Sequence, residues 1–581
     1  MTKKYQLDKK YLHVTTTVLI LAFSGSMFSG CNSGNSNYTA QDRERLEHVR
    51  EFADRVLEAG ADRWSGQNTP LLADGIHVET GEPAEWREDG VESIIHNLSY
   101  QQNLFRVFAG LTNLTGEERY KTAAKEATQY HFDHLISDCG KFHWGGHKFV
   151  DLRTLEPRNK AGSSHELKTH FPFYELMWEV DQEATAQYIR AVWDGHVRDW
   201  RDLTMNRHAS YESGPPPTSS IWENQFDDPE PFFEAPALSF LNAGADLIFS
   251  AGMLYGLGGE QGAIDWALRM ADMYTKARHP ETGMGTYQYT KPSRRNEPPD
   301  GPLTGTLTYS SYGDRTENQF GHTGSSDPDD EFYNPVKNKI GPDGKLVARE
   351  GWMVRSGGFP WYAVIQLHLA ELLGDAVEGF ATDAADHLEA YARHSYDPDE
   401  NHWRAMWADG TDMTGLKVPR TGYHGPKGRV FNPQTASAND MMVYARAYRQ
   451  TGRPFLWETA RSMAQGLGLG DIGRRPGEGV ALNMNAPGSD YDEIFALLEL
   501  YRAAEHPEYL DRARIVADRL IEERFHNGFF FSPDNLIHAD FNRLEPLAIL
   551  SLDAVLRGNP EAVPTHVGSR TSRIGGALFS Q

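Results

Sequence analysis

Amphipathic segments that recur in pairs constrain the fold of this chain more than any other feature. Within each segment apolar residues repeat with the 3.6-residue period of a helix, and glycine-rich breaks such as GLGGEQG (256–262) and RQTGRP (449–454) separate neighbouring segments. A helix with one apolar face is stable only against a partner, so repeated pairs predict a layered all-α fold. The predicted helices lie near residues 41–59, 92–111, 116–137, 172–181, 183–202, 237–257, 261–278, 358–374, 376–394, 437–452, 455–468, 490–504, 507–524 and 543–557.

Four longer breaks carry a tight turn followed by aromatic residues, which is typical of a short β hairpin. They are SDCGKFHWGG (137–146), RHPETGMGTYQY (278–289), HSYDPDENHWRAMW (394–407) and RFHNGFFFSPD (524–534). A unit of two helices and a hairpin therefore repeats without a fixed period. We expect about seven helical pairs to close into one α/α toroid over residues 41–581, with long loops at 208–236 and 291–351. An open solenoid is the alternative, but its repeats would have a uniform length.

The first thirty residues have the pattern of a secretory signal. Four lysines precede the apolar run VTTTVLILAFSGSMF, and a cysteine follows it at position 31. The residues before Cys31 resemble a bacterial lipobox, so residues 1–30 are predicted to be a lipoprotein signal peptide and residues 31–40 a polar tether after lipidated Cys31. An uncleaved membrane anchor is the alternative, but the run is shorter than the ~20 residues a span needs. We therefore expect a protein of the bacterial envelope, anchored to the outer membrane through lipid alone.

Charge and cysteine content exclude several classes of function. The 581 residues contain 57 Lys and Arg against 81 Asp and Glu, a net charge of −24, so nucleic acid is not an expected partner. Cys139 is the one cysteine after Cys31, which excludes an intramolecular disulfide or a cysteine-based metal site in the mature chain.

The stretch SSHELKTHFP (163–172) concentrates ionisable side chains ahead of a proline. His165 and His170 are five residues apart, whereas a zinc peptidase helix needs histidines four apart, so that class is excluded. Ser163 and Glu166 have the spacing of a capping box, which predicts that a helix begins here. A role for Glu166 as a metal ligand is the second interpretation.

Two neighbouring segments favour the metal interpretation. Upstream, KFHWGGHKFVDL places His143 and His147 on a glycine-rich turn; downstream, DWRDLTMNRHAS places Arg207 and His208 just past a predicted helix end. One carboxylate and two imidazoles from three separate segments make a divalent metal site with open positions. These ligands suit manganese, zinc, nickel or cobalt, and calcium less well.

The motifs WGGH, HELKTHFPFYELMWEVD and DWRDLTMNRH resemble the metal-and-arginine region of polysaccharide lyase family 2, the pectate lyases with an α/α barrel. The resemblance covers about residues 144–208. It implies that His147, Glu166 and His208 bind a divalent metal, with manganese preferred, and that Arg207 is the catalytic base. His143 competes with His147 for the first ligand position.

The implied reaction is β-elimination on a 4-linked uronate polymer such as polygalacturonate. The C5 proton is acidified by the neighbouring carboxylate, and positive charge must hold the electron density that develops when the proton leaves. Arginine keeps its proton at almost any pH, so Arg207 is also interpreted as a clamp on a substrate carboxylate, with Lys168 as the alternative base. His143, Trp144, His165 and His170 are predicted to contact the substrate.

Two other functions remain open from the sequence alone. A glycoside hydrolase on uronate-containing glycans would need two carboxylates across the scissile bond, with Asp228, Glu234, Asp409 and Asp492 as candidates. A surface lipoprotein that binds glycans without cleaving them would use aromatic platforms, but sugar binding alone does not call for a cluster of metal-ligand type.

Overall fold

The computed structural model describes residues 38–88, 91–145, 148–159, 164–212, 214–229, 240–285, 358–406, 408, 410–417, 426–531 and 537–568. Within these ranges the chain forms fourteen α helices, and each of the fourteen helices predicted from periodicity is present. They are α1 (Ala40–Gly60), α2 (Gln102–Thr115), α3 (Glu118–His134), α4 (Tyr174–Val180), α5 (Gln182–His196), α6 (Leu241–Gly258), α7 (Gln261–Lys276), α10 (Gly358–Leu373), α11 (Phe380–His394), α12 (Ala438–Thr451), α13 (Pro454–Gly466), α14 (Tyr491–Ala504), α15 (Pro507–Arg524) and α16 (Glu545–Leu556).

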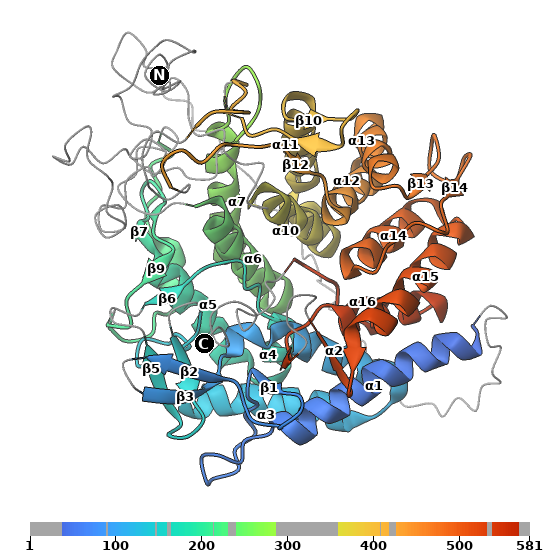
Figure 1. Cartoon of the computed structure of the whole chain (residues 1–581). Coiled ribbons are helices and arrows are strands. Elements are labelled where there is room, and N and C mark those ends of the chain that lie inside the picture. The colour runs from blue at the N-terminus through green and yellow to red at the C-terminus, as the bar shows by residue number, and fades with distance from the viewer. Residues whose placement is uncertain are drawn as a thin grey trace, which may run out of the picture.

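The helices form an inner and an outer layer around a ring (Figure 1). Successive inner helices pack against one another in the order α4, α6, α10, α12, α14, α16 and α2, and each has an outer partner. Helix α6 is buried along nearly its whole length, from Leu241 to Leu254, whereas α7 buries one stripe that runs from Ala263 to Tyr274. An inner helix is covered on all sides and an outer helix on one side, so the distribution of buried residues distinguishes the two layers.

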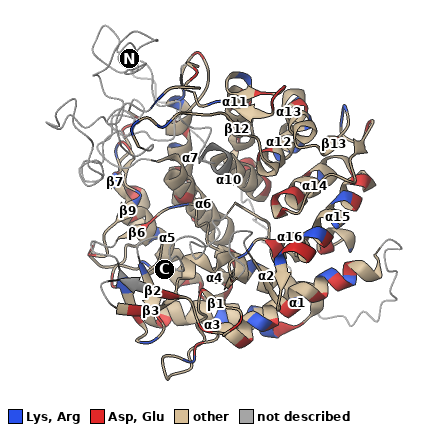
Figure 2. Cartoon of the chain, in the orientation of Figure 1, with Lys and Arg blue, Asp and Glu red and all other residues tan. Residues whose placement is uncertain are grey.

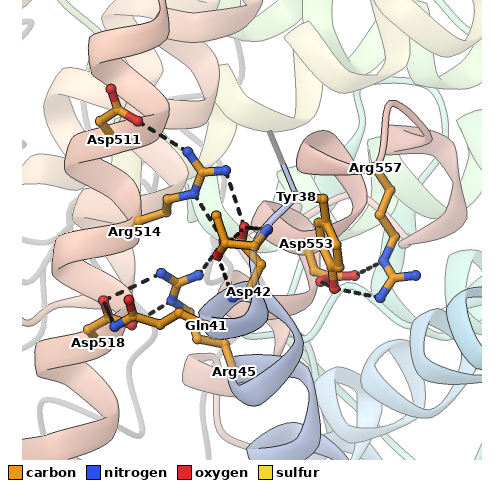
Figure 3. A network of polar contacts seen from close by, with 10 residues as sticks. Tyr38, Gln41, Asp42, Arg45, Asp511, Arg514, Asp518, Asp553 and Arg557 are labelled. Atoms are coloured by element: carbon orange, nitrogen blue, oxygen red, sulfur yellow. Dashed lines mark hydrogen bonds and ion pairs between the residues drawn. The ribbon is translucent and has the colours of Figure 1, made fainter. Parts of the chain in front are cut away.

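The two ends of the chain complete the ring. Helix α1 packs against α15 and α16, so it is the outer partner of α16 and makes the seventh pair. Figure 3 shows the polar contacts at this junction: Arg514 Nε donates to Asp42 Oδ1 at 3.0 Å, and Arg45 Nε donates to Asp518 Oδ1 at 2.6 Å. Figure 2 shows basic and acidic residues interspersed along α1 and α15. The chain is therefore a closed α/α toroid, as predicted, and not an open solenoid.

Short strands connect the helices. Strands β2 (Glu85–Glu88), β3 (Val91–His96), β4 (Lys148–Asp151) and β5 (Glu156–Asn159) form an antiparallel sheet at one side of the ring. The other strands pair in twos and threes. They are β1 (Gly75–His77), β6 (His165–Glu166), β7 (Val197–Asp199), β8 (Thr204–Met205), β9 (His208–Ala209), β10 (Tyr396–Asp397), β11 (His402–Trp403), β12 (Gln434–Thr435), β13 (Gly470–Asp471), β14 (Ala481–Leu482), β15 (Phe525–His526), β16 (Phe529–Phe530) and β17 (His538–Asp540).

Two of the predicted hairpins are confirmed in full, and two helix boundaries are corrected. Strands β10 and β11 pair, as do β15 and β16, at the predicted breaks. The helix predicted from residue 92 begins ten residues later, because residues 91–96 form β3 between two other strands. The helix start predicted at Ser163 and Glu166 is wrong, because Glu166 lies in a strand and the next helix begins at Tyr174; Ser163 itself lies outside the described residues.

Several sequence predictions concern residues outside the described ranges. They include the signal peptide, Cys31 and most of the tether, and the whole of the loop at 291–351. Among the helices that the structure does describe, none has the length and apolar character needed to cross a membrane.

Candidate active site

Two short strands bring the Glu166 and His208 segments together. Strands β6 and β9 are antiparallel, with His165 opposite Ala209 and Glu166 opposite His208. The backbone N–H of Leu167 extends the pairing by donating to the carbonyl oxygen of Arg207 at 2.9 Å. Directly opposite residues of an antiparallel pair project from the same face, so the two side chains meet and His208 Nε2 lies 3.5 Å from Glu166 Oε1.

Glu166 faces three nitrogen groups. Its Oε1 atom lies 3.3 Å from Lys168 Nζ and 3.3 Å from Arg207 Nη2, in addition to the His208 contact. The Glu166 side chain is fully buried, while those of Lys168 and Arg207 are 11% exposed. A buried carboxylate is tolerated when cations and hydrogen-bond donors surround it. The cluster therefore presents one fixed anion and two cations at the edge of the protein interior.

The glycine-rich turn lies directly against Glu166. Gly145 has a φ of +103°, and a Cβ atom there would lie 3.3 Å from Glu166 Cβ, so a larger residue would press on the carboxylate's own backbone. Asn97 holds both sides of this turn, because its Nδ2 donates to the carbonyl oxygens of Gly145 at 2.9 Å and Lys148 at 3.2 Å. His147, which the sequence predicts as a ligand, falls between them and outside the described residues.

The turn after Lys168 is strained and anchored from two inner helices. Thr169 and Phe171 have φ values of +58° and +41°, a conformation that costs about 1–3 kcal/mol per non-glycine residue. Asp246 on α6 compensates by accepting the backbone N–H groups of Thr169 at 2.6 Å and His170 at 3.1 Å. This anchorage fixes the direction in which Lys168 leaves the chain.

Arg106 on α2 provides the second anchor. Its Nη2 donates to the carbonyl oxygen of Phe171 at 2.8 Å. The sequence did not predict Asp246, Arg106 or Asn97 as part of the site. A signal was present for the two charged residues, because each is the one charge within its helix, and both helices become inner helices of the ring.

Three of the four residues predicted to contact the substrate are buried. His165 is fully buried, its Nδ1 lies 2.8 Å from His196 Nε2, and its ring stacks on Trp144 with centroids 5.6 Å apart. His170 packs between Tyr100 and Trp144. Burial holds the pKa of His165 well below its ordinary value, so this ring is neutral. These three side chains pack against one another in the interior, and their contact with substrate stays a prediction.

His143 is less buried and lies beside Tyr211, with ring centroids 4.9 Å apart. Burial, assisted by the charge of Lys148, lowers the pKa of His143 to about 4, so the ring is neutral near pH 7. A neutral imidazole is the form that binds a metal or accepts a hydrogen bond. His143 therefore keeps its place as an alternative first ligand.

The carboxylates proposed for a hydrolase do not form a pair within the described residues. Asp228 is bound to Lys276, with Oδ1 and Nζ 2.8 Å apart. Asp492 lies in the first turn of α14, and burial together with Asp490 raises its pKa well above the ordinary value. Glu234 and Asp409 lie outside the described ranges.

The cluster at β6 and β9 offers part of a divalent metal site. Within the part of the chain that the structure describes, no three His, Cys, Asp or Glu side chains come together as a complete set of ligands. Glu166 and His208 supply one carboxylate oxygen and one imidazole nitrogen 3.5 Å apart, which fits two adjacent ligand positions of manganese, zinc, nickel or cobalt. Glu166 and His208 therefore fit such an ion as two of its ligands.

Comparison with known proteins places the chain in a family. The family model described as "Periplasmic pectate lyase" matches residues 69–576. A pectate disaccharide-lyase of Dickeya dadantii (strain 3937) is 29% identical over 505 residues, which cover 85% of this chain and 86% of the relative. Similar solved structures include a D-mannose isomerase, at 14% identity and a TM-score of 0.41, which covers 74% of this chain and 87% of its own. A family 76 glycoside hydrolase from a bovine Bacteroides thetaiotaomicron strain has 10% identity and a TM-score of 0.39, with coverage of 88% and 77%. Because the family model spans most of the toroid, the chain belongs to the periplasmic pectate lyase family and is a polysaccharide lyase.

Proposed function

We propose that this lyase cleaves a 4-linked uronate polymer, pectate or a close relative, by β-elimination at the Glu166 cluster, leaving a 4,5-unsaturated end. The observation that carries this proposal is the buried Glu166 carboxylate with Lys168, Arg207 and His208 around it. Elimination needs positive charge beside the substrate carboxylate and a base on the C5 proton, and both kinds of group converge here.

The cations of the cluster, Lys168 and Arg207, provide the positive charge that elimination needs beside the substrate carboxylate. When C5 loses its proton, negative charge moves onto the carboxylate attached to it, and fixed cations in a water-poor site stabilise that charge strongly. The Arg207 guanidinium is planar and suits bidentate binding of a carboxylate. Arg207 also packs on the Phe240 ring at 5.3 Å, which holds the guanidinium in one orientation.

Lys168 and Arg207 are the two candidates for the base. A lysine can lose its proton, whereas an arginine keeps it at almost any pH, so Lys168 is the easier base in physical terms, while the family resemblance points to Arg207. The base takes the C5 proton, the C–H electron pair becomes the C4–C5 double bond, and the C4–O bond breaks with its electrons on the leaving sugar oxygen. Whichever of the two is not the base binds the substrate carboxylate.

We further propose that a divalent cation, manganese in preference to calcium, nickel, cobalt or zinc, is held by Glu166, His208 and a histidine of the glycine-rich turn, His147 or His143. When bound, such an ion acts as a Lewis acid on the substrate carboxylate. Glu166 would then offset part of the charge of the ion, as it does for Lys168 and Arg207.

The reaction has a direct test. The mature chain is incubated with polygalacturonate and other uronate polymers, with and without manganese, and the ultraviolet absorbance of the conjugated double bond is followed. A rise that a chelator abolishes is the expected result. New reducing ends without absorbance would indicate hydrolysis and would refute elimination.

We also propose that the protein is anchored to the outer membrane through lipid on Cys31, which the sequence around that residue supports. The chain is expressed in a bacterial host and the membranes are separated from the soluble periplasm. The wild-type chain should sediment with outer membrane and show an acyl mass at Cys31, and Cys31→Ser should be recovered in the soluble fraction. Soluble wild-type protein of unmodified mass would contradict the anchor.

A further inference from the structure

Lys148 is held in place at the start of β4, immediately after the glycine-rich turn. Its Nζ lies 4.0 Å from the centroid of the Tyr211 ring, a cation–π contact. Tyr211 is itself fixed, because its hydroxyl donates to the carbonyl oxygen of Phe142 at 2.9 Å. The lysine backbone is fixed too, by the bond from Asn97. The ammonium therefore has a defined position.

No carboxylate balances this ammonium within the described residues. Two other lysines illustrate the usual pairing with acids: Lys121 lies 2.8 Å from Glu179, and Lys276 lies 2.7 Å from Asp272. The chain as a whole carries a net charge of −24, so acidic side chains are abundant. Lys148 is half-buried on the Tyr211 ring, with His143 and Cys139 close enough to interact with its charge, and an ammonium has three N–H donors to offer an anion.

Lys148 is linked to the Glu166 cluster through the glycine-rich turn. Asn97 ties its backbone to Gly145, and Gly145 lies against Glu166. Tyr211 follows His208 by three residues on the chain that leaves β9. The Lys148 ammonium therefore belongs to a segment next to the Glu166 cluster, and it is not among the three nitrogen groups described above at Glu166.

We propose that Lys148, positioned by Tyr211, forms a separate subsite that binds the carboxylate of a uronate unit next to the one that is cleaved. This inference rests on the proposed function. A fixed cation at a neighbouring unit selects substrates whose carboxylates are free, so Lys148 determines the preference for de-esterified polymer over its methyl ester.

The test compares Lys148→Met with Lys148→Arg. Methionine keeps an unbranched stem on the Tyr211 ring but removes the charge, and arginine keeps the charge. On polygalacturonate, Lys148→Met should raise KM by about five- to tenfold, as for the loss of one partly buried ion pair, with kcat within about twofold. On a highly methyl-esterified polymer of the same length, the variant and the wild type should have nearly equal KM. Lys148→Arg should recover most of the affinity.

Lys276→Met is the matched control, because Lys276 is an exposed lysine already paired with acids, and its KM should not change. The subsite is refuted if Lys148→Met raises KM equally on both polymers, lowers kcat alone, or behaves as the wild type. Calorimetric binding of trigalacturonate and its methyl ester separates this inference from the reaction. Weaker binding of the free acid alone by Lys148→Met supports the subsite even without turnover, and equal binding by both proteins overturns it even if turnover occurs.

Discussion

Glu166→Gln is the substitution that most directly probes the site, because it changes one oxygen to an amide and leaves the shape of the side chain intact. At 3.3 Å, a pair of unit charges at an effective dielectric of about 20 interacts by about 5 kcal/mol. Desolvation cancels part of this energy, and breaking a buried pair costs about 3–5 kcal/mol. The glutamine carbonyl still accepts one hydrogen bond, so we expect the free energy of unfolding to fall by about 3 kcal/mol.

The effect on activity should exceed the effect on stability. Without the carboxylate, Lys168 and Arg207 repel each other and the proposed cation loses a ligand, so kcat/KM on polygalacturonate should fall by at least about 100-fold. Initial rates come from ultraviolet absorbance, and stability comes from denaturant unfolding followed by circular dichroism. The folded variant should retain the helix content of the wild type.

Glu493→Gln provides the matched control. Glu493 is also buried and also accepts from an arginine, Arg512 Nε at 2.8 Å, but it lies on α14, which packs against α12, α15 and α16. This variant should lose comparable stability and keep its activity. The reasoning is refuted if Glu166→Gln retains activity within about threefold of the wild type, or if Glu493→Gln loses as much activity as Glu166→Gln.

Further predictions concern the ring junction, the strained turn and pH. Burial raises the pKa of Asp42, but hydrogen bonds headed by that from Arg514 outweigh it and lower the pKa to about 2. The shift from 3.8 corresponds to about 2 kcal/mol of stability, which is present above pH ~4 and is lost as the pH falls towards 2. Denaturant midpoints of the wild type and Asp42→Asn across that pH range measure this contribution. Parallel pH curves for the two proteins would disprove it. Asp246→Ala removes the acceptor of the Thr169 and His170 backbone N–H groups, so the free energy of unfolding should fall by about 2 kcal/mol. The kcat at saturating substrate should fall as well. An unchanged kcat would show that the turn does not position the site.

The helical pairs could be predicted because each helix carries its own period and its own breaks. The closure of the ring was predicted as well, but the contacts that hold it were not, since Arg514 and Asp42 lie on helices near opposite ends of the chain. Strand β3 was read as helix because a six-residue strand buried at one end has too few residues to show alternation.

The sequence indicated which residues of the candidate site lie together, but not how the fold brings them together. Glu166, Arg207 and His208 were proposed from spacing and resemblance, and the structure brings them into contact. The contact depends on the pairing of β6 with β9 over two residues each, and strands this short show no alternating pattern in the sequence. Asp246 was missed because its role is to accept a backbone N–H of the strained turn at Thr169, and the sequence does not show that this turn lies beside α6.

One measurement tests the central claim most directly: the ultraviolet absorbance of polygalacturonate incubated with the purified mature chain, before and after chelation and after manganese is returned. The account predicts a steady rise from 4,5-unsaturated ends, its loss on chelation, and its recovery with the metal. An absorbance that never rises while reducing ends accumulate would contradict elimination, and a rise that chelation leaves unchanged would contradict the divalent cation at Glu166 and His208.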